Sequence, residues 1–218
     1  MLSPLSGFPV SLNATGEMGL AISPSGSFLY TSNPNTRVIT SFLINSAGAL
    51  TPLATTVAPN SAPAFLTFDS VGNFLFAINS GGGVAGNGSV SEFTVSATGA
   101  LTEQPGSPFV VGATPVNAVF SNGVLYVVNQ TSGTLSALAL NATTGALTDI
   151  KGSPYAVGSR PVSIALANRG NFLLVTNSAS STSGLISIFS VAADGTLAPV
   201  GGSPFTPDAP VPNQVLAL

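Results

Sequence analysis

The chain has 218 residues, only 5% of them charged, and its net charge is −3. Four basic residues form no patch that could bind a nucleic-acid backbone, so we expect no nucleic-acid partner. The sequence contains neither Cys nor His, which excludes disulfides, thiolate nucleophiles and the usual ligands of zinc and haem. We therefore expect no metal and no cofactor.

The low charge and the apolar runs bear on where the protein resides. Globular proteins carry roughly 25% charged residues, so this composition favours an extracytoplasmic protein, either secreted, periplasmic or at the cell surface. The N-terminus, Met1 to Pro4, shows neither the charged nor the apolar region of a signal peptide. Apolar runs such as 124–128 are far shorter than the roughly 18 residues of a spanning helix, so we expect no membrane span.

Taken in chain order, the sequence repeats one pattern four times. An apolar segment that ends in Asn recurs at 28–33, 74–79, 124–129 and 172–177. A Gly-Ala-Leu-Thr-like segment follows at 48–51, 99–102, 145–148 and 195–198. A Gly-Ser-Pro-aromatic segment appears at 106–109, 152–155 and 202–205. Three linked signatures at a common spacing indicate an internal structural repeat.

Each repeat contains signals for four strands. The first strand follows a proline, as in 63–68 and 161–166, because proline lacks the N–H that a central ladder needs. A glycine turn leads to the second strand, which ends at the repeated Asn. The third strand, seen in 90–95 and 186–191, alternates in polarity with period two. A second glycine turn opens the fourth strand. Sustained helical periodicity is missing, so we expect essentially no helix.

Four strands in each repeat predict an all-β propeller of four-stranded antiparallel blades. We place one domain over 1–218, with complete blades at about 17–56, 63–109, 115–155 and 161–205. Single strands at 1–10 and 212–218 are expected to belong to partial blades. The chain then forms an incomplete arc of a larger ring. The open ends of such an arc would expose apolar sheet faces, so self-association is expected.

The repeated signatures resemble those of a known family. The segment Ser23–Asn33, the Gly-Ala-Leu-Thr turns and the Gly-Ser-Pro-Phe segments together are similar to the seven-bladed β-propeller lactonase family, which includes 6-phosphogluconolactonase-type enzymes, and in style to YVTN surface-layer repeats. The resemblance implies a seven-bladed ring whose active members gather Arg, Glu and His at the mouth of the central channel. This chain departs from that pattern because it contains no His.

Candidate site residues come from the rim of the propeller. Loops that lead into the first strand and loops that join the second strand to the third share one rim. Four charged residues fall on it: Glu17, Arg37, Arg160 and Asp208. Glu17 could act as a general base towards water, and Arg160 could hold a carbonyl or phosphate oxygen; Arg37 and Asp208 are candidates for ligand contact. The alternative is that these charges simply occupy solvated loops.

Two further patterns are interpreted as structural. Gly81–Gly86 matches G-x-G-x-x-G, but the expected strand at 90–95 follows it, whereas a dinucleotide fingerprint needs a helix. The repeated Asn33, Asn79, Asn129 and Asn177 are expected to satisfy backbone groups at their turns.

Taken together, the sequence favours a non-catalytic module that binds a sugar lactone, a carbohydrate or a protein. The alternative is a lactone hydrolase of the 6-phosphogluconolactonase type, with part of its site on blades beyond this chain.

Overall fold

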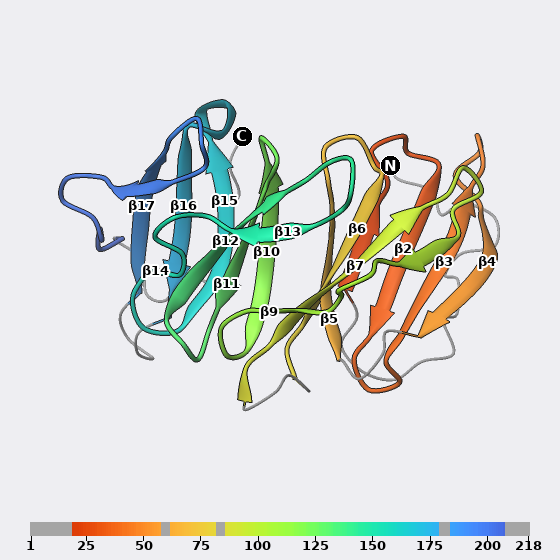
Figure 1. The fold of residues 1–218 in the computed structure, drawn as a ribbon, viewed down its shortest axis with the longest axis horizontal. Coiled ribbons are helices and arrows are strands. Elements are labelled where there is room, and N and C mark those ends of the chain that lie inside the picture. Colours follow the sequence, from red (N-terminus) through yellow and green to blue (C-terminus); the bar gives the residue numbers. More distant parts are fainter. Residues whose placement is uncertain (1–18, 58–61, 82–85, 179–183, 208–218) are drawn as a thin grey trace, which may run out of the picture.

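The computed structural model describes residues 19–57, 62–81, 86–178 and 184–207, and these form four antiparallel sheets in chain order (Figure 1). The first blade contains β1 (Gly19–Ile22), β2 (Phe28–Asn33), β3 (Val38–Ile44) and β4 (Leu50–Val57). The second contains β5 (Pro63–Phe68), β6 (Phe74–Asn79), β7 (Ser89–Val95), β8 (Leu101–Glu103) and β9 (Phe109–Val110). The third contains β10 (Pro115–Ser121), β11 (Val124–Asn129), β12 (Thr134–Leu140), β13 (Leu147–Asp149) and β14 (Tyr155–Ala156). The fourth contains β15 (Pro161–Ala167), β16 (Phe172–Asn177), β17 (Leu185–Val191) and β18 (Leu197–Pro199).

The first strands of the four blades lie next to one another. β1 contacts β5, β5 contacts β10, and β10 contacts β15, so these strands line the inner side of an arc. Within each sheet the strands pair in the order of the sequence, first to second to third to fourth. This arrangement is that of consecutive propeller blades, as the repeat predicts. In the described ranges helical structure is limited to 3₁₀ conformation, at η2 (Asn168–Gly170) and at Gly86, which agrees with the expectation of almost no helix.

Proline sets the start of the first strand in three blades. β5, β10 and β15 begin at Pro63, Pro115 and Pro161, and each proline is paired with the Asn that closes the second strand. The register shifts directly after each proline. A proline at the first position costs no ladder hydrogen bond, because that bond is already interrupted there.

The Gly-Ser-Pro segments join the outer edge of the blade to the third strand. The hydroxyls of Ser107, Ser153 and Ser203 accept hydrogen bonds of 2.9–3.1 Å from third-strand N–H groups. In the second and third blades these serines lie where the outermost edge divides into two short strands, β8 and β9 or β13 and β14. The serine hydroxyl therefore satisfies an N–H that the edge strand leaves without a backbone partner.

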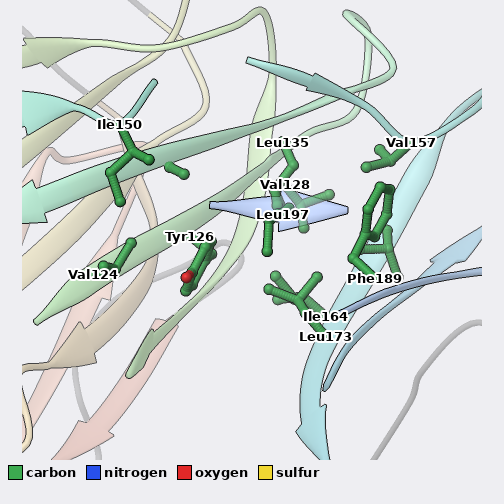
Figure 2. Close-up of a cluster of buried hydrophobic side chains, with 12 residues drawn as sticks. Val124, Tyr126, Val128, Leu135, Ile150, Val157, Ile164, Leu173, Phe189 and Leu197 are labelled. Atoms are coloured by element: carbon green, nitrogen blue, oxygen red, sulfur yellow. The ribbon is translucent and has the colours of Figure 1, made fainter. Parts of the chain in front are cut away.

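Three hydrophobic clusters lie at the three junctions between blades. Figure 2 shows the junction of the third and fourth blades, where Tyr126 and Val128 of β11 meet Ile164 of β15 and Leu173 of β16. Both faces of each inner blade are therefore buried against neighbours. Burial of this kind is the main source of stability for such a sheet stack.

Tyrosine hydroxyls tie two of the three junctions together. Tyr30 in β2 donates to the carbonyl of Gly99 at 2.8 Å, and Tyr126 in β11 donates to the carbonyl of Gly195 at 2.9 Å. Both acceptors are the glycine of the Gly-Ala-Leu-Thr-like signature in the next blade. This glycine has a positive φ, 79° at Gly99 and 81° at Gly195, a conformation that favours glycine at the turn.

Candidate functional site

The loops that the sequence assigns to one rim do share one edge of the structure. The β2–β3, β11–β12 and β14–β15 connections all lie along the lower edge in Figure 1. Arg37 is in the first of these loops and Arg160 is in the last. Glu17 and Asp208 lie outside the described residues, as do the predicted end strands 1–10 and 212–218, so their placement stays a prediction.

A pocket of about 670 Å³ opens on this rim between the third and fourth blades. Its volume falls within the roughly 300–1,000 Å³ of small-molecule sites. The β11–β12 loop forms one wall and the connection from β14 to β15 forms the other. The lining residues are Gln130, Thr131, Ser132, Gly133, Ala156, Gly158, Ser159 and Arg160. Arg160 is the only charged residue among them, and most of the others offer hydroxyl, amide or backbone groups.

The β11–β12 wall is fixed by hydrogen bonds to the segment that leads into its own blade. Thr131 Oγ1 donates to Thr114 Oγ1 at 2.8 Å, and the N–H of Ala113 donates to Ser132 Oγ at 2.7 Å. On the other side, the N–H of Val157 donates to the carbonyl of Gly133 at 3.0 Å. The loop is thus held from two directions, which gives the pocket a preformed wall.

Two glycines allow the walls to approach closely. A Cβ on Gly133 would lie 2.9 Å from the carbonyl oxygen of Gly158, too close for a real side chain. Both glycines also have a positive φ, 65° and 99°, which favours glycine at each position.

Arg160 is held in an uncommon backbone conformation directly before Pro161. Its φ is 49°, in the left-handed region, and its carbonyl accepts a 2.9 Å hydrogen bond from the N–H of Ser178. Thr114 occupies the equivalent position in the third blade, with a φ of 53° and the same type of bond from Gln130. Non-glycine residues with positive φ cluster at functional sites, although here the repeat itself provides the bond that fixes the carbonyl.

The two described arginine candidates do not meet in one pocket. Arg37 lies on the first blade, at the position that Gly133 takes in the third, and it is not among the lining residues. A second pocket, of about 450 Å³, lies between the first two blades among loops such as 23–28 and 71–73, and none of its lining residues is charged. Of the two predicted rim residues that the structure describes, Arg160 lines the pocket between the third and fourth blades, and Arg37 lines neither of these two pockets.

Four polar lining residues escaped the sequence reasoning: Gln130, Thr131, Ser132 and Ser159. Their loops lie on the same predicted rim as Arg160, since that rim contains the loops before first strands and the loops between second and third strands. Ser and Thr are so frequent in this sequence that residue type alone gave no reason to select them.

The repeated asparagines are structural, but their partners differ from the expectation. Only Asn33 follows it fully, since its Oδ1 accepts from the N–H groups of Asn35 and Thr36. Asn79, Asn129 and Asn177 instead donate from Nδ2 to Ser or Thr hydroxyls on the neighbouring third strand, at 2.9–3.2 Å. Each of these three is fully buried, and the amide ties the second strand to the third just below the rim.

Among the described residues, no three or more Asp, Glu, His or Cys side chains gather in a metal-binding arrangement. Within the same ranges, no helix is long and apolar enough to cross a membrane. For the Gly81–Gly86 motif, a strand, β7, follows as expected, while residues 82–85 lie outside the description.

Comparison with known families agrees with the repeat and the fold. The family model described as "Lactonase, 7-bladed beta-propeller" matches residues 4–84, 36–116 and 82–214. The chain belongs to the seven-bladed β-propeller lactonase family. Among curated proteins, no sequence matches significantly.

Solved structures give the same fold. A candidate 6-phosphogluconolactonase from Bacteroides fragilis is 25% identical, with a TM-score of 0.71 over 90% of this chain and 56% of that one. A second candidate, from Bacteroides uniformis, is 19% identical, with a TM-score of 0.74 over 89% and 56%. The periplasmic gluconolactonase of Pseudomonas aeruginosa is 21% identical, with a TM-score of 0.66 over 88% and 56%. The chain thus spans a little over half the length of these lactonase-family structures.

Proposed function

We propose that this chain is the part of a sugar lactonase that binds the polar, anionic portion of its substrate in the pocket beside Arg160. The observation that carries the proposal is the composition of that pocket, which combines one guanidinium with several hydroxyl and amide groups on fixed loops. Sugar lactones and their acids present several hydroxyls and, when phosphorylated or hydrolysed, an anion. Arginine is well suited to bind a carboxylate or phosphate with two parallel hydrogen bonds.

The family match supports the hydrolase over the non-catalytic module that the sequence favoured. In lactone hydrolysis the oxygen of water bonds to the carbonyl carbon, the bond from that carbon to the ring oxygen breaks, and the free hydroxy acid results. A general base takes the proton from water, and a cation stabilises the developing oxyanion. Glu17 is the candidate base in this chain, and Asp208 a further acid of the same predicted rim. Full activity is expected to require the remaining blades of the ring.

Binding tests the proposal without requiring turnover. Isothermal titration calorimetry with 6-phosphogluconate, the hydrolysis product, is expected to show binding to the chain. Arg160→Gln should weaken that binding about ten- to hundredfold, because a hydrogen bond to a charged group contributes roughly 1.5–3 kcal/mol. Arg169→Gln is the matched control: Arg169 is also exposed and also has a positive φ, but it lies in η2, on the connection from β15 to β16.

Equal affinities for the two arginine variants, or no binding of 6-phosphogluconate to the unaltered chain, would contradict the assignment of the pocket. For the hydrolysis step, release of acid from a panel of lactones would be followed in a pH-stat. If the chain shows turnover and Glu17→Gln leaves its rate unchanged, Glu17 is not the base.

An extracytoplasmic location is part of the same proposal. Two observations support it: the very low charge of the sequence and the name of the Pseudomonas aeruginosa structure as a periplasmic gluconolactonase. Fractionation of cells that express the native gene would test it, with recovery in the cytoplasm as the contrary result.

A further inference from the structure

The pocket between the first two blades lies on the edge of the arc opposite the Arg160 pocket. The edges are opposite because the β1–β2 and β2–β3 loops lie at the two ends of β2 (Figure 1). Its walls come from the β1–β2 loop at 23–27, the β5–β6 loop at 69–73 and the turn that follows β7. Its volume of about 450 Å³ falls within the roughly 300–1,000 Å³ of small-molecule sites.

Long loops in the first two blades form these walls. The connection at the same place in the third blade is only 122–123. The two long loops meet where Gly72 packs on Pro24: a Cβ on Gly72 would lie 2.9 Å from Pro24 Cδ, and the φ of Gly72 is 85°. A side chain at this position would push the two walls apart, so their contact depends on glycine.

Hydrogen bonds within the loops fix their shape. Ser23 Oγ accepts the first N–H of β2 at 3.0 Å, and Asp69 Oδ1 accepts the first N–H of β6 at 2.9 Å. The N–H of Val95 donates to the carbonyl of Asn73 at 2.9 Å and joins the β5–β6 loop to the third wall. The pocket is therefore formed before a ligand arrives, which lowers the entropy cost of binding.

Apolar side chains line part of this pocket. Phe28 and Val95 are half-buried, and Pro24 and Val71 are exposed. Val71 is 69% exposed, the highest value for a large apolar side chain in the described part of the chain. Exposed apolar surface beside a pocket indicates a ligand that would cover it.

The remaining lining groups are polar but uncharged. The side chains of Ser27 and Asn73 make no hydrogen bond within the described ranges, so both can bind a ligand. Asp69 is not part of the lining, because it is 5% exposed and its carboxylate is bonded within its own loop. An ion would lose hydration in this pocket without meeting an opposite charge, which favours a neutral ligand.

We propose that this pocket binds a neutral saccharide. A sugar ring has an apolar C–H face and a surrounding set of hydroxyls that both donate and accept hydrogen bonds. The apolar face would lie on Phe28 and Val71, and the hydroxyls would bond to Ser27 and Asn73. A neutral sugar fits this lining better than a sugar acid, because a carboxylate would have no cationic partner here. The inference does not depend on the proposed lactone site, which lies on the other edge.

Nuclear magnetic resonance of the full chain with isotope-labelled valine methyl groups tests the proposal. Titration with maltose or with cellobiose should shift the methyl signals of Val71 and Val95 saturably, with a Kd of about 1 mM or below. The signals of Val157, which lies next to the Arg160 pocket, should not move. The absence of a saturable shift with both sugars, or equal shifts at Val157, would overturn the proposal.

Substitutions test which groups hold the sugar. Asn73→Ala should weaken binding about two- to tenfold through loss of a neutral hydrogen bond, and Phe28→Leu by a similar factor through loss of the aromatic ring. Asn87→Ala is the matched control, because Asn87 is also an exposed asparagine but lies before β7, on the other edge. Arg160→Gln should leave sugar binding unchanged, which separates this site from the lactone site. Equal affinities for the two asparagine variants, or weaker binding by Arg160→Gln, would overturn the assignment of the saccharide to this pocket.

Discussion

Replacing Glu92 with glutamine tests how the junction between the second and third blades depends on pH. Glu92 lies in the middle of β7, is fully buried, and has no hydrogen-bond partner for either carboxylate oxygen. Its Oε1 lies near Gly145 of the third blade, 3.1 Å from where a Cβ would be. Burial, with a smaller contribution from the negative charge of Asp69, raises the pKa of Glu92 from 4.5 to about 7. The carboxyl is therefore largely protonated in the folded state at mildly acidic pH.

The size of the effect follows from this difference in pKa. The folded state binds the proton more tightly than the unfolded state, so the native chain is most stable below about pH 4.5 with respect to this group. Its free energy of unfolding then falls as pH rises from about 4.5 to about 7, and levels off above that. Each pKa unit corresponds to about 1.4 kcal/mol, so the total loss is about 3 kcal/mol. Glu92→Gln keeps the shape and removes the titration, so it should be more stable than the native chain by about 3 kcal/mol above about pH 8.

Urea unfolding followed by far-ultraviolet circular dichroism between about pH 4 and pH 9 would measure this difference. Glu103→Gln is the matched control, because Glu103 lies in the adjacent strand of the same blade but is only half-buried, where it accepts the hydroxyl of Ser107. The control should keep the pH dependence of the native chain between about pH 4.5 and pH 7. Parallel stability curves for Glu92→Gln and the native chain would refute the reasoning, since the two would then not differ in a buried titrating group.

Three other substitutions address the junctions and the rim. Tyr126→Phe should lower the free energy of unfolding by about 1–3 kcal/mol, because it leaves the buried carbonyl of Gly195 without its hydrogen-bond donor. Tyr155→Phe is the control: the Tyr155 hydroxyl makes an exposed hydrogen bond, so its loss should cost less in the same urea assay. The double variant Phe76→Tyr/Glu92→Ala should give the second junction the tyrosine that the first and third junctions contain. Because the variant lacks the Glu92 carboxyl, its free energy of unfolding should not change between about pH 4.5 and pH 7; a free energy that still falls over this range would contradict the prediction. Gly112→Ala should lower the melting temperature, because the new Cβ would lie 2.7 Å from the side chain of Asn129. Gly106→Ala is the control: its Cβ would meet no atom within 4 Å, so any loss of stability there comes only from the positive φ of that position. An equal loss in both glycine variants would show that contact with Asn129 is not the cause.

The fold was predictable because its determinants are local and repeated. Proline before a strand, glycine with positive φ at a turn, and serine in a Gly-Ser-Pro segment each act within a few residues of their own position. Pro63, Gly99 and Ser107 show these three roles in one blade. Because the same local solution recurs at a regular spacing, stacking of the repeats follows from the sequence alone.

The candidate site was predictable only in part. The sequence selects Arg160 as a rim residue because blade topology sets which loops share an edge, and in the structure Arg160 lines a pocket together with the β11–β12 loop. The sequence could not show that Arg160 lines the same pocket as Gln130 and Ser132, or that Arg37 does not line it. Those relations depend on how two neighbouring blades pack, which no single repeat encodes.

Sequence by itself determined the blades, their order and the residues at their turns, since these depend on backbone chemistry over short distances. Tertiary structure decided which side chains lose contact with water. In the strand that contains Ser91, Glu92 and Phe93, the alternation of polar and apolar residues predicts that one face of the sheet is exposed to solvent. Both faces are covered by neighbouring blades, and all three residues are buried. The partners of Asn129 and Asn177 were decided in the same way, because their amides are enclosed with the hydroxyls of the adjacent strand. A sheet that packs on both sides makes burial a property of its neighbours, and that is why the carboxyl of Glu92 is visible only in the assembled arc.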